Sequence, residues 1–210
     1  MKPRSVEEFY GPALTEAIEE LRALDPWLVA LKSGAEYQKL SATAGRIKLK
    51  FFGEDYLINY PECTVKEAMT GREAPIVTKI LLLHYLINAD GTRLADKWAS
   101  FRQLPGGLFY EPVFRDRAIK PLERAFGEDL EGFTAAAKAL GGERLSFGDA
   151  SFMFQILPRL RMAVILHLAD EEFPASVNVL FDASAANYLP TYDLTVVAEM
   201  LAKRLTKRGR

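Results

Sequence analysis

Two pairs of alternating apolar segments constrain the fold of this chain more than any other feature. In the second pair, apolar side chains recur at every other position over residues 150–156, stop at Pro158-Arg159 and return over residues 162–168. A period of two is typical of β-strands, and the proline turn joins the two strands into a hairpin. Both faces of the returning strand are largely apolar, which predicts a strand in the interior of a sheet.

The first pair predicts another hairpin, closer to the N-terminus. Apolar residues alternate with lysines over residues 47–51, residues 52–55 supply a turn, and the alternation resumes over residues 56–60. Pro61 ends the second strand because proline has no amide to donate to a sheet.

Helical periodicity accounts for much of the remaining chain. Residues 5–32 form one amphipathic segment that begins with a capping box at Ser5 and Glu8. We expect Pro26 to divide this segment, with Asp25 as the cap of its second part. The apolar face expected on the segment consists of Phe9, Ala13, Ala17, Leu21, Leu24, Leu28 and Leu31.

Pro75 opens a helix over about residues 75–89 that is apolar nearly all round, which predicts a buried central helix. A C-terminal helix is expected over about residues 191–206. The shorter elements expected are a strand over 98–104, helices over 112–125 and 129–140, and a strand over 176–181. The sequence therefore predicts an α+β fold in a single domain, with the two antiparallel β-hairpins contributing to a sheet that packs against these helices.

Composition excludes several classes of function. The 27 Lys+Arg and 28 Asp+Glu give a net charge of −1, which argues against DNA as a partner. Cys63 is the one cysteine, so a disulfide, a zinc ribbon or an iron–sulfur cluster within the chain is excluded. The longest apolar run, residues 80–87, is too short to cross a membrane, and no signal peptide is recognised. We therefore expect a cytoplasmic protein.

The first group of candidate residues lies in an aromatic segment with two arginines. Trp98, Arg102, Tyr110 and Arg115 are the types of side chain that stack on a planar anionic ligand and pair with its charge. The same composition is found where a loop wraps a core. Within this segment, Pro105-Gly106-Gly107 is either an amide nest for an anion or a turn that needs glycine.

The second group consists of the two histidines and a run of acids. His84 and His167 are candidates for an axial ligand of a tetrapyrrole or corrinoid, and His84 also for a base. The alternatives are a structural role in the core for His84, and packing and solvation near a strand end for His167. Asp170, Glu171 and Glu172 follow a predicted central strand and could bind Mg²⁺ or Ca²⁺, against the alternative of a solvated turn. The basic residues 203–210 fit the negative end of the last helix.

Several motifs together carry a family resemblance. They are Lys79–Leu86, Ala89–Thr92, Ser100–Gly107, Tyr110–Phe114, Leu157–Arg159, Asp170–Pro174, Leu180–Asp182 and Tyr188–Pro190. Over nearly the whole chain they resemble DUF3786, a bacterial and archaeal family of unknown function, which implies one DUF3786-like domain over residues 1–210. The resemblance also implies an anaerobic source. Some members carry an iron–sulfur module similar to that of corrinoid iron–sulfur proteins, which Cys63 alone cannot replace, so a partner would have to supply any cluster.

Three functions follow from these observations. The first is a ligand-binding or accessory protein in anaerobic cofactor or metalloprotein metabolism, with a tetrapyrrole or corrinoid as the candidate ligand. The second is a protein–protein interaction module, whose distinguishing sign would be an exposed apolar patch. The third is a metal-assisted enzyme that uses the Asp170–Glu172 carboxylates, for which no catalytic residue is assigned beyond these acids.

Overall fold

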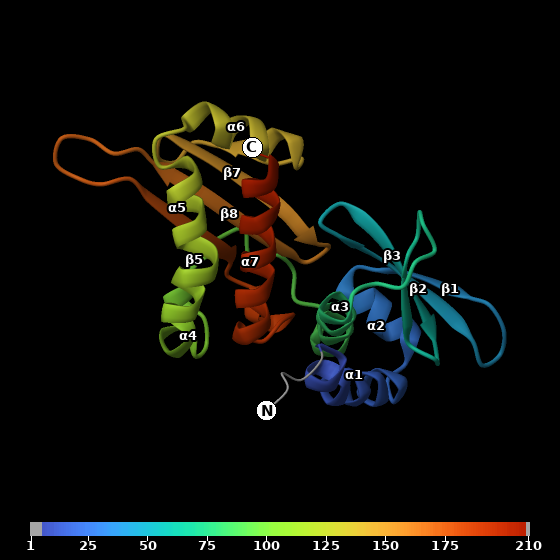
Figure 1. The fold of residues 1–210 in the computed structure, drawn as a ribbon. Helices are drawn as coiled ribbons and strands as arrows, with labels where there is room; N and C mark the ends of the chain where they lie inside the picture. The colour runs from blue at the N-terminus through green and yellow to red at the C-terminus, as the bar shows by residue number, and fades with distance from the viewer. Residues whose placement is uncertain (1–5, 209–210) are drawn as a thin grey trace. The chain divides into compact units, whose positions relative to one another are not determined.

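The computed structural model describes residues 6–208, in which the strands pair into two antiparallel sheets (Figure 1). The chain divides into two compact units. The first unit consists of the described residues up to Arg93 together with Leu157–Arg159 and Asn187–Leu189. The second unit consists of Leu94–Ile156, Leu160–Ala186 and the described residues from Pro190 onward.

The first unit contains the predicted N-terminal hairpin. Its sheet has the strand order β1-β2-β3-β4, and its strands are β1 (Glu36–Lys39), β2 (Gly45–Phe51), β3 (Glu54–Tyr60) and β4 (Thr64–Glu67). Its helices are α1 (Val6–Arg22), α2 (Pro26–Ser33) and α3 (Ile76–Asn88). Ile47 of β2 lies opposite Ile58 of β3, and both side chains are buried, as the alternation predicted. The predicted buried helix is α3, on which Leu82 and Leu83 are fully enclosed.

The second unit contains the predicted C-terminal hairpin. Its sheet has the order β5-β9-β8-β7-β6, with β5 (Trp98–Ser100), β6 (Glu143–Leu145), β7 (Ala150–Leu157), β8 (Leu160–His167) and β9 (Ser176–Asp182). The expected interior strand is β8, the middle strand of this order, and its residues 162–166 are all buried. The α+β class is thus confirmed, and each predicted hairpin contributes to a sheet of its own. The single domain over residues 1–210 stays a prediction.

Helices lie over the sheet of the second unit (Figure 1). The helical segments are a 3₁₀ turn η1 (Phe101–Gln103), α4 (Gly107–Phe114), a π-helical turn η2 (Arg115–Ile119), α5 (Lys120–Phe126), α6 (Leu130–Ala139), a 3₁₀ turn η3 (Ala185–Asn187) and α7 (Thr191–Arg208). Stacked rings of Phe101 and Phe114, 4.1 Å between centroids, pack beside Phe181 of β9. This aromatic cluster joins η1 and the end of α4 to the sheet.

The N-terminal apolar face differs from the prediction. Ala17 and Leu21 of α1 are buried, whereas Phe9, Leu28 and Leu31 are exposed. For Leu28 and Leu31 the physical reason is that α2 is a separate helix, which begins at Pro26 with Asp25 as its cap as predicted, so the periodicity of α1 does not continue through it. Val29, Ala30 and Ser33 are the buried residues of α2. The predicted cap at Ser5 lies outside the described residues.

Two other boundaries differ, and three short strands are additional. The strand predicted over 98–104 ends at Ser100, because the chain turns there into η1. The helix predicted over 112–125 begins earlier, at Gly107, and contains the π-helical turn η2. The short strands β1, β4 and β6 were not predicted. Among residues 6–208, no helix combines the length and the apolar character that crossing a membrane requires.

Candidate functional site

The structure distributes the predicted site residues over both units. His84 is half-buried on α3 of the first unit, where its carbonyl accepts a hydrogen bond of 2.8 Å from the side chain of Asn88. The other predicted residues belong to the second unit: Trp98, Arg102, Tyr110, Arg115, His167, Asp170, Glu171 and Glu172. Their roles in ligand or metal binding stay predictions.

The aromatic–arginine segment is partly brought together around α4. Arg102 precedes this helix, and its Nε lies 2.8 Å from Oε2 of Glu111 on the helix. The ring of Tyr110 meets the edge of Tyr192 at 6.0 Å between centroids. Trp98 lies on β5 opposite Asp182, and Arg115 is exposed at the start of η2. The Arg102 guanidinium is therefore engaged by a carboxylate of the same segment.

The most exposed apolar side chains of this segment lie on α4. Leu108 is 65% and Phe109 81% exposed, and Val113 and Tyr192 are also exposed. Phe109 and Val113 are four residues apart and so share one side of the helix. The rings of Phe109, Tyr110 and Tyr192 follow one another edge to face. We call the surface formed by Leu108, Phe109 and Val113 of α4, together with Tyr192 of α7, the α4 face.

The connection into α4 requires both glycines of the Pro105-Gly106-Gly107 motif. Gly106 has a φ of +71°, the left-handed conformation that residues with a Cβ adopt at a cost. A Cβ on Gly107 would overlap the carbonyl oxygen of Phe101. The Gly107 amide donates to Leu104 and the Phe109 amide to Gly106, at 2.9 and 3.1 Å. The Gly107 amide thus serves the turn, which favours the structural one of the two interpretations of this motif.

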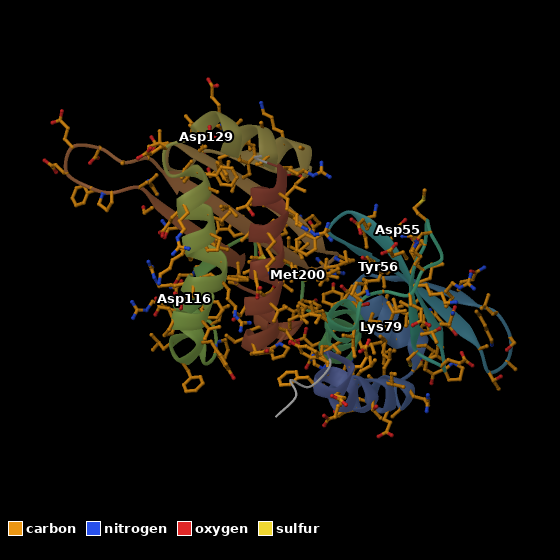
Figure 2. All side chains as sticks on the ribbon, in the orientation of Figure 1. Asp55, Tyr56, Lys79, Asp116, Asp129 and Met200 are labelled. Atoms are coloured by element: carbon orange, nitrogen blue, oxygen red, sulfur yellow. The ribbon has the colours of Figure 1, made fainter. Side chains whose placement is uncertain are left out.

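The helix is also irregular at its other end. Pro112 lies inside α4 and has no amide to donate to the preceding turn. The next turn is π-helical, and the Lys120 amide donates to the Arg115 carbonyl across it. Asp116, labelled in Figure 2 on this stretch, pairs with Lys120 at 2.6 Å. Such π-helical turns are rare in proteins, and those that do occur are often found at functional sites.

The structure also brings His167 and Asp170 to one surface hollow of about 540 Å³. Asp149, which sequence analysis did not single out, lines the same hollow, and its Oδ2 accepts from the Leu168 amide at 2.8 Å. Oδ1 of Asp170 accepts from the amides of Phe173 and Glu172 at 2.7 and 2.9 Å. These two bonds hold the pKa of Asp170 below its ordinary value.

The other two acids of this run are placed differently. Glu171 and Glu172 are exposed and do not line the hollow. Within the part of the chain that the structure describes, no group of three or more His, Cys, Asp or Glu residues is arranged to hold a metal ion. A sequence signal for this part of the hollow lies in the predicted hairpin, because Asp149 directly precedes β7, His167 ends β8, and the two strands are neighbours in the sheet.

The fold and these surfaces define a class: an α+β protein with an exposed aromatic helix face and an acidic hollow in one unit. Residues 25–204 match the family model described as a domain of unknown function, DUF3786. The chain belongs to this family, as the motifs in its sequence indicated. No curated protein and no solved structure matches the chain.

Proposed function

We propose that the chain is an accessory binding protein that docks a partner protein on the α4 face. The observation that carries the proposal is the exposure of Phe109, 81% of whose surface is open to solvent. Large apolar side chains that gather on the surface of a soluble protein mark interaction sites. Aromatic residues also supply much of the binding energy at protein interfaces.

The shape of the surface favours a protein over a small planar ligand. Small-molecule sites are concave and enclose most of their ligand. Leu108, Phe109 and Val113 instead project from a helix, and a projecting helix face fits the groove of another protein. Arg102, a predicted anion ligand, already pairs with Glu111.

The charges around the α4 face indicate the chemistry of the partner. Residues 101–120 carry four cations, of which Arg102, Arg117 and Lys120 pair with Glu111, Glu199 and Asp116, and the fourth, Arg115, is exposed beside the face. A partner with an apolar groove and an acidic rim would complement this surface. An iron–sulfur or corrinoid protein, the partner that the family resemblance implies, would occupy the face in this proposal. The chain would then serve anaerobic cofactor or metalloprotein metabolism.

The experiment places a photo-crosslinking amino acid at position 109 of the full chain in its native cells. A second chain carries the same group in place of Trp27, an aromatic residue of the first unit that is 59% exposed. We expect one protein to be captured from position 109 and not from position 27. That protein is then purified, and its affinity for the wild-type chain and for Phe109→Ala and Arg115→Glu variants is measured.

The proposal predicts that Phe109→Ala weakens this affinity by about thirtyfold, as expected for a central aromatic anchor. Arg115→Glu should weaken binding less, and its effect should shrink at high salt because exposed charges are screened. Equal capture from positions 109 and 27 would refute the proposal. So would a purified partner that binds the Phe109→Ala variant as tightly as the wild-type chain.

A further inference from the structure

A second surface of the same unit has a different chemistry. The hollow at the end of β8 lies beside the loop that connects β8 to β9, and its volume of about 540 Å³ is within the range of small-molecule sites. Its polar and aromatic lining consists of Asp149, His167, Asp170, Phe173, Ser176 and Asn178. The lining therefore combines carboxylate, imidazole, hydroxyl and amide groups with one aromatic ring.

The charge of this lining is negative and uncompensated. Neither lysine nor arginine is among the described residues that line the hollow. None of the ion pairs between described residues involves Asp149 or Asp170. Each carboxylate uses one oxygen for backbone amides, Oδ2 of Asp149 and Oδ1 of Asp170, so each retains a second oxygen as an acceptor.

The local backbone holds His167 against this hollow. Gly148 has a φ of +54°, and a Cβ at this position would lie 3.1 Å from Cε1 of His167 and 2.7 Å from the carbonyl oxygen of Leu166. The absence of a side chain at Gly148 lets the turn before β7 approach the end of β8 closely. Asp149 and His167 lie at the open end of the β7–β8 hairpin, where the Asp149 amide donates to the Leu166 carbonyl at 3.0 Å, so the hairpin brings both side chains to one hollow.

We propose that the hollow binds a small organic cation with a primary ammonium or guanidinium group. The carboxylates of Asp149 and Asp170 recognise the charge, and Ser176 and Asn178 offer further hydrogen-bond partners. Phe173 supplies an aromatic surface for the apolar part of the ligand and for its charged end. This proposal does not depend on the α4 face.

The experiment titrates the isotope-labelled full chain with putrescine and follows backbone amide resonances by NMR. The control ligand is the neutral diol of the same length, which has the same shape and lacks the charge. We expect putrescine, and not the diol, to shift the amides of Leu168, Glu172 and Phe173 in a saturable manner. In separate titrations, the chloride salts of Mg²⁺ and Zn²⁺ replace putrescine.

Matched variants separate recognition in the hollow from general attraction to an acidic loop. Asp149→Asn and Asp170→Asn keep an oxygen that accepts the backbone amides but remove the charge, and each should weaken putrescine binding about threefold to fivefold. Glu171→Gln and Glu172→Gln remove the same charge outside the hollow and should leave binding unchanged. Equal effects of all four variants, equal shifts with the diol, or saturation by a metal ion without any by putrescine would overturn the proposal.

Discussion

The two units each expose an apolar helix face, and they differ in what the chain needs in order to form it. In the first unit, α2 exposes Trp27, Leu28 and Leu31 on a regular helix, whose first amides are capped by Asp25 at 2.9 and 3.1 Å. In the second unit, α4 forms only after a left-handed glycine and a glycine with no room for a side chain. Local structure that a generic sequence could not adopt is typical of functional positions, which favours α4 over α2 as the docking surface.

The units differ in their buried polar groups as well. In the first unit the Tyr85 hydroxyl donates to the Ser33 carbonyl at 2.6 Å and accepts from the Arg159 amide at 2.9 Å. In the second unit the Asp182 carboxylate accepts four bonds, from the amides of Ala95, Asp96 and Ser184 and from the Ser184 hydroxyl. One unit thus relies on a neutral group and the other on a charged one.

The largest expected effect is that of Gly107→Ala. Because the new Cβ would overlap the Phe101 carbonyl, the variant has to displace the start of α4, which should lower the free energy of unfolding of the second unit by about 3 kcal/mol or more. Gly106→Ala is the matched control: it meets open space, so only its left-handed backbone costs about 1 kcal/mol. Urea unfolding is followed by Trp98 fluorescence in a Trp27→Phe background. Similar losses for the two variants would contradict the tight approach at Gly107.

Asp182→Asn should come next, with a loss of about 2–3 kcal/mol in the unfolding free energy of the second unit. Both oxygens of Asp182 accept amide hydrogens, so the NH₂ group of an asparagine would face a donor. Asp170→Asn in the same unit is the control, since Asp170 uses one oxygen for both of its amide bonds and should lose under about 1 kcal/mol. The measurement is again urea unfolding by Trp98 fluorescence, and an equal loss in the control would count against the Asp182 network.

Tyr85→Phe should cost the first unit about 1–2 kcal/mol, because it leaves the Ser33 carbonyl and the Arg159 amide without their buried partner. Trp27 in a Trp98→Phe background reports this unit. An unfolding midpoint equal to that of the parent would show that the hydroxyl does not stabilise the fold.

The difference in buried groups predicts that the units lose stability at opposite ends of the pH scale. Burial raises the pKa of Asp182, but hydrogen bonds from Ser184, Ala95 and Asp96 outweigh it and hold the pKa below its ordinary value. The stabilisation is therefore present above pH of about 4 and is lost as the pH falls through the lowered value. Burial raises the pKa of Tyr85 far above its ordinary value, against the opposing bond from the Arg159 amide. Its stabilisation is complete below pH of about 10 and declines above it.

Unfolding free energies of the two single-tryptophan chains across pH test this pair of effects. The unfolding free energy followed by Trp98 should fall more steeply in acid, and Asp182→Asn should make that fall less steep. The unfolding free energy followed by Trp27 should fall more steeply in alkali, and Tyr85→Phe should make that fall less steep. Identical pH profiles for both signals would contradict the prediction that the two units lose stability at opposite ends of the pH scale.

Those parts of the fold that depend on local periodicity could be predicted from the sequence. The β2–β3 and β7–β8 hairpins and the buried helix α3 each carry a pattern within one segment of chain. The short strands β1, β4 and β6 were missed because they form by pairing with a stronger neighbour. The exposure of Leu28 and Leu31 was missed because apolar periodicity marks a face and does not say whether a partner element covers it.

The candidate site was predictable to a similar extent. The aromatic–arginine segment and the residues His167 and Asp170 were recognised from their chemistry. The exposure of Phe109 could not be deduced, because an aromatic residue in a helix does not reveal whether another element covers it. The pairing of Arg102 with Glu111 also arises only once the chain has turned into α4.

The most direct test of the docking role is a comparison of Phe109→Ala with Trp27→Ala, one aromatic residue from each exposed face. Both side chains are solvent-exposed, so each variant should change the free energy of unfolding by less than about 0.5 kcal/mol. Titration calorimetry with the purified partner should give an affinity about thirtyfold weaker for Phe109→Ala and unchanged for Trp27→Ala. Wild-type affinity in the Phe109→Ala chain, or an equal loss in both variants, would contradict the assignment of α4 as the docking surface.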